Sequence, residues 1–273
     1  MPHFTCNFLS YTLDRAVDID VIIPGVTSTE AEQPGVTHRP KAPYPVLYLL
    51  HGYCNDYSTW ERYTSIERYA EERRIAVVTF SGENNFYCRT ADFRGPSPVA
   101  ELVNPDYDAF LEKELPDFVT SMFPVSRRRS ETYIAGLSMG GFGALYHGYR
   151  YPSHYRAVGA FSPLTTLHRA PWEDPSAVEP AFRRYEPLLL MRKARQSGRA
   201  MPPLYYAYGN DDFLKDIQDW FAAALDKDKL PHTLDNLDGY GHEWAFWDLE
   251  VKRFLDWIPR DDVYYRDNPI RRI

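Results

Sequence analysis

The stretch "IAGLSMGGFGALYHG", residues 134–148, is an apolar run that places a single serine, Ser138, among glycines and then continues with small and apolar residues. Four glycines lie close to this serine: Gly136, Gly140, Gly141 and Gly143. Glycine weakens the interior of a strand or helix because it loses more backbone freedom on folding than any other residue. Four glycines together therefore need a local geometric reason, such as a sharp turn or a close approach of two backbone segments.

Outward from this stretch, apolar runs typical of strands alternate with helical patterns. We predict strands at residues 4–13, 15–24, 46–52, 75–80, 131–137, 155–162, 203–209 and 232–237, and helices at about 60–73, 105–122, directly after Ser138, 213–227 and 243–258. The first two strands are predicted to pair as a hairpin. Residues 24–45 are rich in Pro, Thr and Gly without a hydrophobic period, which predicts a surface loop.

The alternation of strands and helices predicts an α/β fold with a mostly parallel central sheet and helices on both faces. A chain of 273 residues with 44% hydrophobic residues is long enough for one large core, so we expect a single domain over residues 1–273. The long connection at about residues 162–201 predicts a small cap insertion. Sheets of this kind bind ligands at the carboxyl ends of their strands.

Ser138 follows the strand at residues 131–137 and directly precedes a predicted helix, which is the strand-turn-helix arrangement of a nucleophile elbow. Gly136 and Gly140 are expected to leave room for neighbouring backbone in this tight turn, with the serine held in a strained conformation. Gly141 and Gly143 are expected to let the helix pack closely on the sheet. The alternative is a close-packed turn with an inert serine.

A serine nucleophile needs a base, and in elbow-type enzymes the chain order is serine, acid, histidine. His242 lies in "GYGHEW", a glycine-bracketed loop after the last predicted strand, where an imidazole can reach Ser138. His168 precedes the loop that would carry the acid, and His232 opens a strand at the opposite end of the sheet. His242 is therefore the predicted base. The alternative for His242 is a helix-capping or solvent-facing role.

The acid is expected in "YGNDDFL", the loop that follows the strand at residues 203–209. Asp211 and Asp212 both qualify, but adjacent residues in a turn point in different directions, and the Gly-x-x-Asp spacing favours Asp212. Either aspartate could instead cap the helix that follows, because aspartate is a preferred N-cap residue. Asp235 and Asp238 are weaker candidates because they are close in sequence to His242.

An oxyanion hole completes such a site, and its expected donors are two backbone amides. The stretch "LLHGYCNDYSTW", residues 49–60, places His51 and Gly52 at the end of a strand and a helix shortly afterwards. We assign the two donors to the amides of Tyr53 and Met139. His51 is expected to orient this loop by a hydrogen bond and not to act as a catalyst.

Composition excludes several function classes. A formal net charge of −7 argues against a nucleic-acid or anionic-membrane surface, and no apolar run is long enough to span a membrane. The three cysteines are odd in number, lack metal-ligand spacing and follow no signal peptide, which favours a reduced, cytoplasmic setting. We expect a soluble protein whose partner is a small molecule, and its composition is also compatible with a homo-oligomer.

Taken together, "LLHGYCNDYSTW", "YIAGLSMGGFGAL", "YGNDDFL" and "GYGHEW", in this order, resemble the putative-esterase family of α/β-hydrolases. Within that family the chain is most similar to small bacterial carboxylesterases of the tributyrin and feruloyl type. The resemblance implies an α/β-hydrolase fold, with the nucleophile at Ser138, the acid at Asp212 and the base at His242. The resemblance to S-formylglutathione hydrolases (esterase D) is weaker, because those enzymes carry His where this chain has Leu137.

The reaction that this set of residues implies is hydrolysis of short-chain acyl or aryl esters, of the cinnamoyl or feruloyl type, through an acyl-enzyme, with no metal or cofactor. Three alternatives stay open: acyl transfer to an alcohol, thioester hydrolysis like that of S-formylglutathione hydrolase, and a non-catalytic binding module of the same fold. Two segments contain aromatic and apolar residues that could either line an acyl pocket or pack in the core. The segment after the strand at residues 75–80 contains Phe86, Tyr87 and Phe93, and the connection at 162–201 contains Trp172, Phe182, Tyr185 and Leu188 to Met191.

Overall fold

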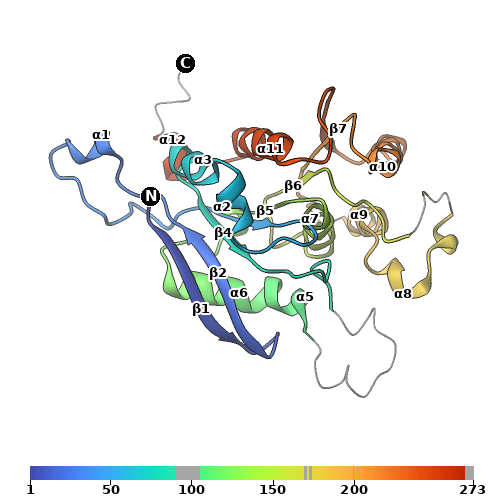
Figure 1. The fold of residues 1–273 in the computed structure, drawn as a ribbon, viewed down its shortest axis with the longest axis horizontal. Helices are drawn as coiled ribbons and strands as arrows, with labels where there is room; N and C mark the ends of the chain where they lie inside the picture. The colour runs from blue at the N-terminus through green and yellow to red at the C-terminus, as the bar shows by residue number, and fades with distance from the viewer. Residues whose placement is uncertain (90–104, 169–170, 172–173, 199, 268–273) are drawn as a thin grey trace.

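The central element of the structure is an eight-stranded sheet in the order β1-β2-β4-β3-β5-β6-β7-β8 (Figure 1). This computed structural model describes residues 1–89, 105–168, 171, 174–198 and 200–267. The strands are β1 (His3–Ser10), β2 (Arg15–Ile22), β3 (Val46–Leu50), β4 (Ala76–Phe80), β5 (Thr132–Leu137), β6 (Ala157–Phe161), β7 (Leu204–Gly209) and β8 (His232–Leu237). β2 is antiparallel to both β1 and β4, and every pairing from β4 to β8 is parallel. The predicted hairpin and the mostly parallel sheet are confirmed.

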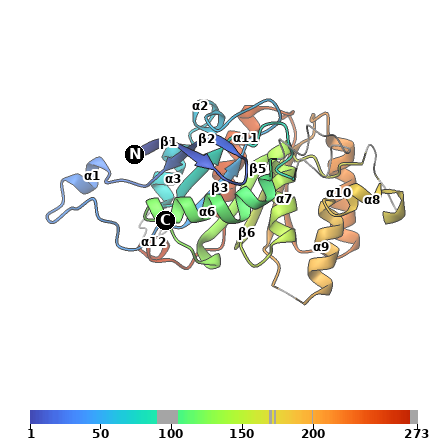
Figure 2. The same ribbon diagram turned by 90° about the horizontal axis from the view of Figure 1, so that it is seen from below.

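Helices cover both faces of this sheet (Figures 1 and 2). They are α1 (Ser28–Ala31), α2 (Thr59–Tyr63), α3 (Ile66–Arg73), α5 (Tyr107–Ala109), α6 (Leu115–Met122), α7 (Met139–Arg150), α8 (Pro180–Arg183), α9 (Pro187–Gln196), α10 (Lys215–Lys227), α11 (Trp244–Trp257) and α12 (Val263–Arg266). One buried apolar cluster joins the sheet to α5, α6, α7, α9 and α10, and a second joins it to α2, α3 and α11.

β3 shows why the strand sequences are continuously apolar. Tyr48 and Leu50 contribute to the first cluster, while Leu47 and Leu49 contribute to the second. Because successive side chains of a strand point to opposite faces, a strand covered by helices on both faces needs apolar residues at every position. β3, β4 and β6 are therefore buried along their whole length, and β5 is buried after its first residue, Thr132.

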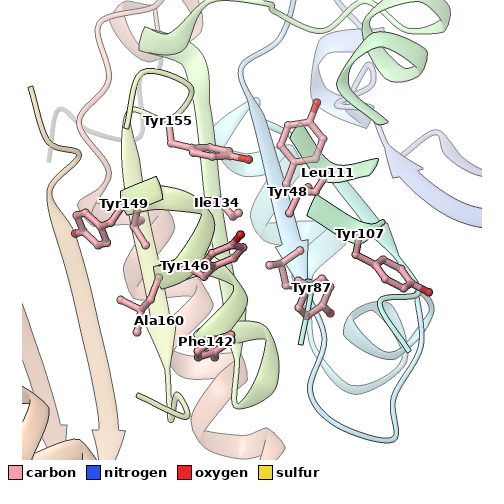
Figure 3. Packing of buried hydrophobic residues seen from close by; sticks show 14 of the residues in the cluster. Tyr48, Tyr87, Tyr107, Leu111, Ile134, Phe142, Tyr146, Tyr149, Tyr155 and Ala160 are labelled. Carbon is pink, nitrogen blue, oxygen red and sulfur yellow. The ribbon is translucent and has the colours of Figure 1, made fainter. Parts of the chain in front are cut away.

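Tyrosines make up much of the first cluster, as Figure 3 shows for Tyr48, Tyr87, Tyr146 and Tyr155. The hydroxyls of Tyr155 and Tyr146 find partners inside the protein: that of Tyr155 donates to Glu112 Oε1 at 2.8 Å, and that of Tyr146 to Asp108 Oδ1 at 3.0 Å. A buried hydroxyl without a partner would destabilise the fold, so these bonds allow the core to contain large rings. Much of the high aromatic content therefore serves packing.

The predicted helix at residues 60–73 is divided into α2 and α3. Thr64 adopts an extended conformation, and its hydroxyl donates to the carbonyl oxygen of Trp60 at 2.5 Å. The amide of Ser65 donates to Asp248 Oδ1 at 2.8 Å, a residue of α11 that is remote in sequence. This tertiary bond takes the place of a helical one and allows the chain to change direction.

Three other segments differ from the prediction. The loop at residues 24–45 contains one helical turn, α1, which begins with a capping box in which Thr27 and Glu30 each accept the other's backbone amide. The predicted helix at residues 105–122 contains a π-helical segment, Phe110–Glu114, between α5 and α6. α12 was not predicted.

The long connection between β6 and β7 contains α8 and α9, and α9 packs against α7 and α10. In both views these helices lie at the opposite end of the molecule from α1 (Figures 1 and 2). Among the helices of the described residues, none is long and apolar enough to cross a membrane.

Candidate active site

Ser138 lies in the sharp turn that joins β5 to α7. Its backbone has φ +53° and ψ −116°, a combination that residues other than glycine rarely adopt. The turn is held from both sides, because the Ser138 amide donates to the carbonyl oxygen of Phe161 at 2.9 Å and its own carbonyl oxygen accepts the amides of Phe142 and Leu164. The surrounding structure therefore fixes the strained conformation, as predicted for an elbow.

The glycines around Ser138 allow backbone segments to touch. A Cβ atom on Gly136 would overlap the carbonyl oxygen of Gly140, and a Cβ on Gly140 would overlap the carbonyl oxygens of Leu50 and His51. The prediction for these two glycines is confirmed. Gly141 differs from the prediction, because its nearest neighbour is the Pro163 side chain.

The structure brings Ser138, His242 and Asp212 together in one chain of hydrogen bonds. His242 Nε2 lies 2.9 Å from Ser138 Oγ, and His242 Nδ1 lies 2.9 Å from Asp212 Oδ2. Because Asp212 is an acceptor, the His242 Nδ1 carries a proton and Nε2 faces the serine hydroxyl. This is the arrangement in which an imidazole can take up a hydroxyl proton.

Asp212 is suited to orient an imidazole. Its side chain is fully buried, whereas that of His242 is 15% exposed. Burial raises the pKa of Asp212, but the hydrogen bonds from His242 and from the Leu214 amide outweigh it and keep the pKa below its usual value. The carboxylate is therefore charged at neutral pH and can stabilise an imidazolium.

The neighbouring aspartates are placed elsewhere. Asp211 is exposed, and its backbone amide donates to the carbonyl oxygen of Tyr240 at 3.0 Å. Asp235 bonds Arg253 at 2.8 Å, and Asp238 accepts from Asn210. Neither aspartate is the side-chain cap of α10, whose N-cap residue is Leu214; Asp212 Oδ1 accepts the Leu214 amide at 2.8 Å just before the helix begins.

Three residues near the triad were not identified from the sequence. Phe213 and Trp247 contact the His242 ring, with centroids 4.5 Å and 5.0 Å away. Gln218 on α10 is fully buried, and its Nε2 lies 3.4 Å from Asp212 Oδ2. Phe213 follows the acid directly in "NDDFL", and this adjacency was the available signal.

The loop after β3 lies against the elbow. A Cβ on Gly52 would be 3.5 Å from the Cβ of Ser138, so the backbone that leads to Tyr53 runs beside the serine. Met139 is the first residue of α7, and amides in the first turn of a helix have no partner within that helix. Both expected oxyanion donors therefore belong to backbone close to Ser138.

His51 holds this loop, as the sequence predicted. Its Nε2 accepts the amide of Gly82 at 2.8 Å, and its Nδ1 donates to the carbonyl oxygen of Gly52 at 2.7 Å. Burial lowers the pKa of His51, so the ring is neutral in the form that both bonds require. His51 is 1% exposed and ties β3 to the loop after β4.

The aromatic residues considered for an acyl pocket have different positions. Tyr87 and Tyr185 are fully buried and belong to the first apolar cluster, as do Leu188 and Met191, so their side chains are core. Phe86 is half-buried, and its ring lies 6.2 Å from that of Tyr53. Phe93 and Trp172 lie outside the described residues.

Comparisons with known proteins identify the family of this chain. A family described as "Putative esterase" matches residues 33–257. The chain is 27% identical over 271 residues to an acetyl esterase of Caldicellulosiruptor saccharolyticus, covering 93% of this chain and 97% of the relative.

Solved structures with this fold include two from Staphylococcus aureus. The fluorophosphonate-binding serine hydrolase FphF has a TM-score of 0.75 at 27% identity and covers 95% of this chain and 99% of its own. The S-formylglutathione hydrolase FrmB has a TM-score of 0.74 at 27% identity, and the match covers 94% of this chain and 98% of FrmB. A ferulic acid esterase at 24% identity shares the fold, with a TM-score of 0.71 and coverage of 93% and 96%.

The family match spans most of the chain, and the structural neighbours confirm the predicted α/β-hydrolase fold. This chain therefore belongs to the putative-esterase family and is a carboxylic ester hydrolase.

Proposed function

We propose that this protein is a serine carboxylesterase that hydrolyses short-chain acyl or aryl esters, with Ser138 as nucleophile, His242 as base and Asp212 as the acid that orients it. The observation that carries the proposal is the continuous chain of hydrogen bonds from Asp212 through His242 to Ser138 Oγ. In a member of an esterase family, these hydrogen bonds supply an activated hydroxyl at the carboxyl end of a parallel strand.

In the proposed reaction, Ser138 Oγ attacks the ester carbonyl carbon while His242 Nε2 takes the hydroxyl proton. The tetrahedral intermediate collapses, the alcohol leaves with the proton held by His242, and the acyl group stays on Ser138. Water then gives a proton to His242 and attacks the acyl carbon, which releases the acid and restores Ser138. Asp212 stays ionised and holds the imidazole in one tautomer.

We assign oxyanion binding to the amides of Tyr53 and Met139. One belongs to the loop that His51 holds, and the other begins α7, whose N-terminal end favours negative charge. Two amides held on separate rigid elements can stabilise the charge that develops on the carbonyl oxygen without moving during the reaction.

The proposed substrate class rests on the side chains around the triad. Phe213 is 76% exposed although it contacts His242, and Tyr53 is 54% exposed. Exposed rings beside a nucleophile offer apolar contact to a small acyl or aryl group. The acetyl esterase and ferulic acid esterase among the similar proteins support the same two kinds of acyl group.

We infer that the described parts of the connection at residues 162–201 form one side of the substrate site within a single domain. The amide of Leu164 donates to the Ser138 carbonyl oxygen at 3.2 Å, so this segment begins directly over the elbow. α9 then returns to the core through Leu188 and Met191.

The experiment that tests the proposal is a hydrolysis panel of p-nitrophenyl acetate to decanoate together with methyl ferulate, with the Ser138→Ala variant as the blank. We expect kcat/KM to be highest for a short acyl chain or for the ferulate, and the variant to lose at least about 10⁴-fold in kcat. Activity of the variant within tenfold of the native enzyme would refute Ser138 as nucleophile. Equal Tm values for the two proteins would show that the loss is chemical.

Two alternatives are distinguished in the same panel. S-formylglutathione hydrolase FrmB shares the fold, so S-formylglutathione is included in the panel. A kcat/KM for S-formylglutathione well above that for every oxygen ester would replace our proposal with thioester hydrolysis. Added alcohol separates acyl transfer, because a transferase yields the new ester in preference to the free acid.

A further inference from the structure

A second group of polar side chains lies away from the triad, where β1, β2 and α2 meet. It consists of His3 on β1, Asp20 on β2 and Glu61 on α2, and each offers one ligand atom within 4.8 Å of the others. Asp20 faces Thr79 of β4 across the strand pair, and the Thr79 hydroxyl donates to Glu61 Oε1 at 3.3 Å. The three groups therefore converge on one point under α2.

Asp20 is buried and Glu61 is half-buried, and each has one enclosed carboxylate oxygen without a partner among the described residues. Asp20 is only 3% exposed, and its Oδ1 finds no hydrogen-bond partner in the part of the chain that the structure describes; the same holds for Glu61 Oε2. The other oxygen of Asp20, Oδ2, lies 3.3 Å from His3 Nε2. Burying a carboxylate oxygen without a donor is costly, so two such oxygens in one place indicate a cation that the protein is built to hold.

The arrangement of His3 supports the same conclusion. While Nε2 faces Asp20, Nδ1 lies 3.1 Å from Glu67 Oε1 on α3. A histidine that ligates a metal through one ring nitrogen commonly donates the N–H of the other to a carboxylate, which fixes the tautomer and the ring orientation. Glu67 is placed to serve this role.

From these contacts we propose that His3 Nε2, Asp20 and Glu61 form a binding site for a divalent transition-metal ion, with Zn²⁺ as the best match. An imidazole with two carboxylates suits Zn²⁺ or Mn²⁺, whereas Mg²⁺ and Ca²⁺ prefer oxygen ligands alone. A coordination position remains for water. The site is distinct from the triad, and its expected role is to fasten β1 and β2 to α2.

Glu61 fits this role chemically. Its Oε2 and the Oδ1 atom of Asp20 both lie inside the protein without a hydrogen-bond partner among the described residues. Two carboxylates that face each other in a buried space cannot both stay ionised cheaply without a positive charge between them. A bound cation would supply that charge.

Isothermal titration of Zn²⁺, Mn²⁺, Mg²⁺ and Ca²⁺ into chelator-treated protein tests the proposal. We compare the native chain with an Asp20→Asn/Glu61→Gln double variant and with Asp18→Asn. Asp18 lies on the same strand and bonds Asn7 at 2.7 Å, so this control removes a nearby charge but no proposed ligand. We expect one Zn²⁺ per chain in the native and control proteins, and a loss of at least tenfold in affinity in the double variant.

Zn²⁺ binding that is absent from the native chain, or unchanged in the double variant, would overturn the proposal. Equal affinity for Mg²⁺ or Ca²⁺ would overturn the assignment to a transition metal. A Glu67→Gln variant should weaken Zn²⁺ binding by about 10-fold or more. If the double variant does not fold, His3→Gln serves instead, because the side chain of His3 is 31% exposed.

Thermal unfolding gives an independent measurement. At a Zn²⁺ concentration about 100 times the Kd, Tm of the native chain should rise by roughly 5 to 10 °C, because the ion binds the folded state alone. The double variant should show no Zn²⁺-dependent rise, and a rise equal to that of the native chain would place the effect elsewhere.

Discussion

Asp211 and Asp212 are adjacent in the chain, yet only one of them can orient the imidazole. The Asp212 carboxylate is buried and contacts His242, whereas Asp211 is exposed and takes part in the structure through its backbone. Sequence spacing favoured Asp212 but could not exclude Asp211, because the direction of each side chain depends on the turn after β7.

The difference between the two aspartates can be measured. Asp212→Asn should lower kcat by about 10³- to 10⁴-fold with little change in KM, because the amide favours the wrong imidazole tautomer while the substrate contacts remain. Asp211→Asn is the matched control and should leave kcat nearly unchanged, with a stability change within about 0.5 kcal/mol. Steady-state kinetics and Tm of both variants give the answer. A large loss of kcat in Asp211→Asn alone would reverse the assignment.

Among the secondary-structure elements, α7 packs closely against the sheet at Gly140. Its Cα faces the carbonyl oxygens of Leu50 and His51, where backbone and not a flexible side chain occupies the space. Gly140→Ala should force α7 and β3 apart and cost about 1 to 3 kcal/mol. Gly241→Ala is the control, because its added methyl group would have its nearest neighbour, the Asp211 carbonyl oxygen, at 3.5 Å. Similar urea midpoints for the two variants would contradict this explanation.

The π-helical segment before α6 places Glu112 in a buried cluster. Glu112 accepts His147 Nδ1 at 2.6 Å, His154 Nδ1 at 2.6 Å and the Tyr155 hydroxyl at 2.8 Å. His147 Nε2 faces the carbonyl oxygen of Tyr87 at 2.8 Å, so both of its ring nitrogens face acceptors. A ring with two donors is an imidazolium, and His147 therefore carries its charge inside the core.

The pKa shifts in this cluster give a pH dependence with a definite sign. Burial lowers the pKa of His147, but hydrogen bonding and attraction to Glu112 outweigh it and raise the pKa; the bond to Glu112 also raises the pKa of His154. Burial raises the pKa of Glu112, and the two histidines more than reverse that effect. The cluster therefore stabilises the protein fully at pH values between 4.5, the ordinary pKa of Glu, and 6.5, the ordinary pKa of His. This stabilisation is lost as pH rises through the raised histidine values or falls through the lowered value of Glu112.

Glu112→Gln should therefore destabilise the protein most near pH 5.5, by about 3 to 5 kcal/mol, and less at pH 9. Urea unfolding of the native and variant proteins at both pH values measures the difference. Glu114→Gln is the control in the same π-helical segment, because Glu114 accepts the Ser10 hydroxyl and the backbone amides of Tyr11 and Thr12, without a histidine. Its cost should not decline at high pH. A Glu112→Gln cost that grows with pH would contradict the prediction.

At the scale of the whole molecule, the proposed site draws on the ends of β3, β5, β7 and β8, which are separated only by β6 in this part of the sheet. Ser138, Asp212 and His242 keep their distances only while these strands stay in register. We expect labelling of Ser138 by a fluorophosphonate to disappear at the same urea concentration as the tertiary structure, followed by tryptophan fluorescence. Loss of labelling at a clearly lower concentration would show that the loops after β7 and β8 loosen first.

Much of this arrangement could be predicted because the strand ends are marked in the sequence. Continuous apolar runs identified the buried strands, and glycine-rich or acidic loops after them identified Ser138, Asp212 and His242. Features set by distant contacts could not be predicted. The break at Ser65 depends on Asp248, 183 residues away, and burial of Tyr87 depends on the hydrogen bond that its hydroxyl donates to the carbonyl oxygen of His51 at 2.9 Å.

The order of the proposed triad along the chain has a consequence for protein synthesis. Ser138 and His242 are 104 residues apart, so the ribosome makes the serine and its strand well before the base. At about 5 to 20 residues per second, the interval lasts roughly 5 to 20 s. A nascent chain can thus fold its elbow while the serine is still unactivated, and hydrolysis can begin only once the loop after β8 has left the ribosome.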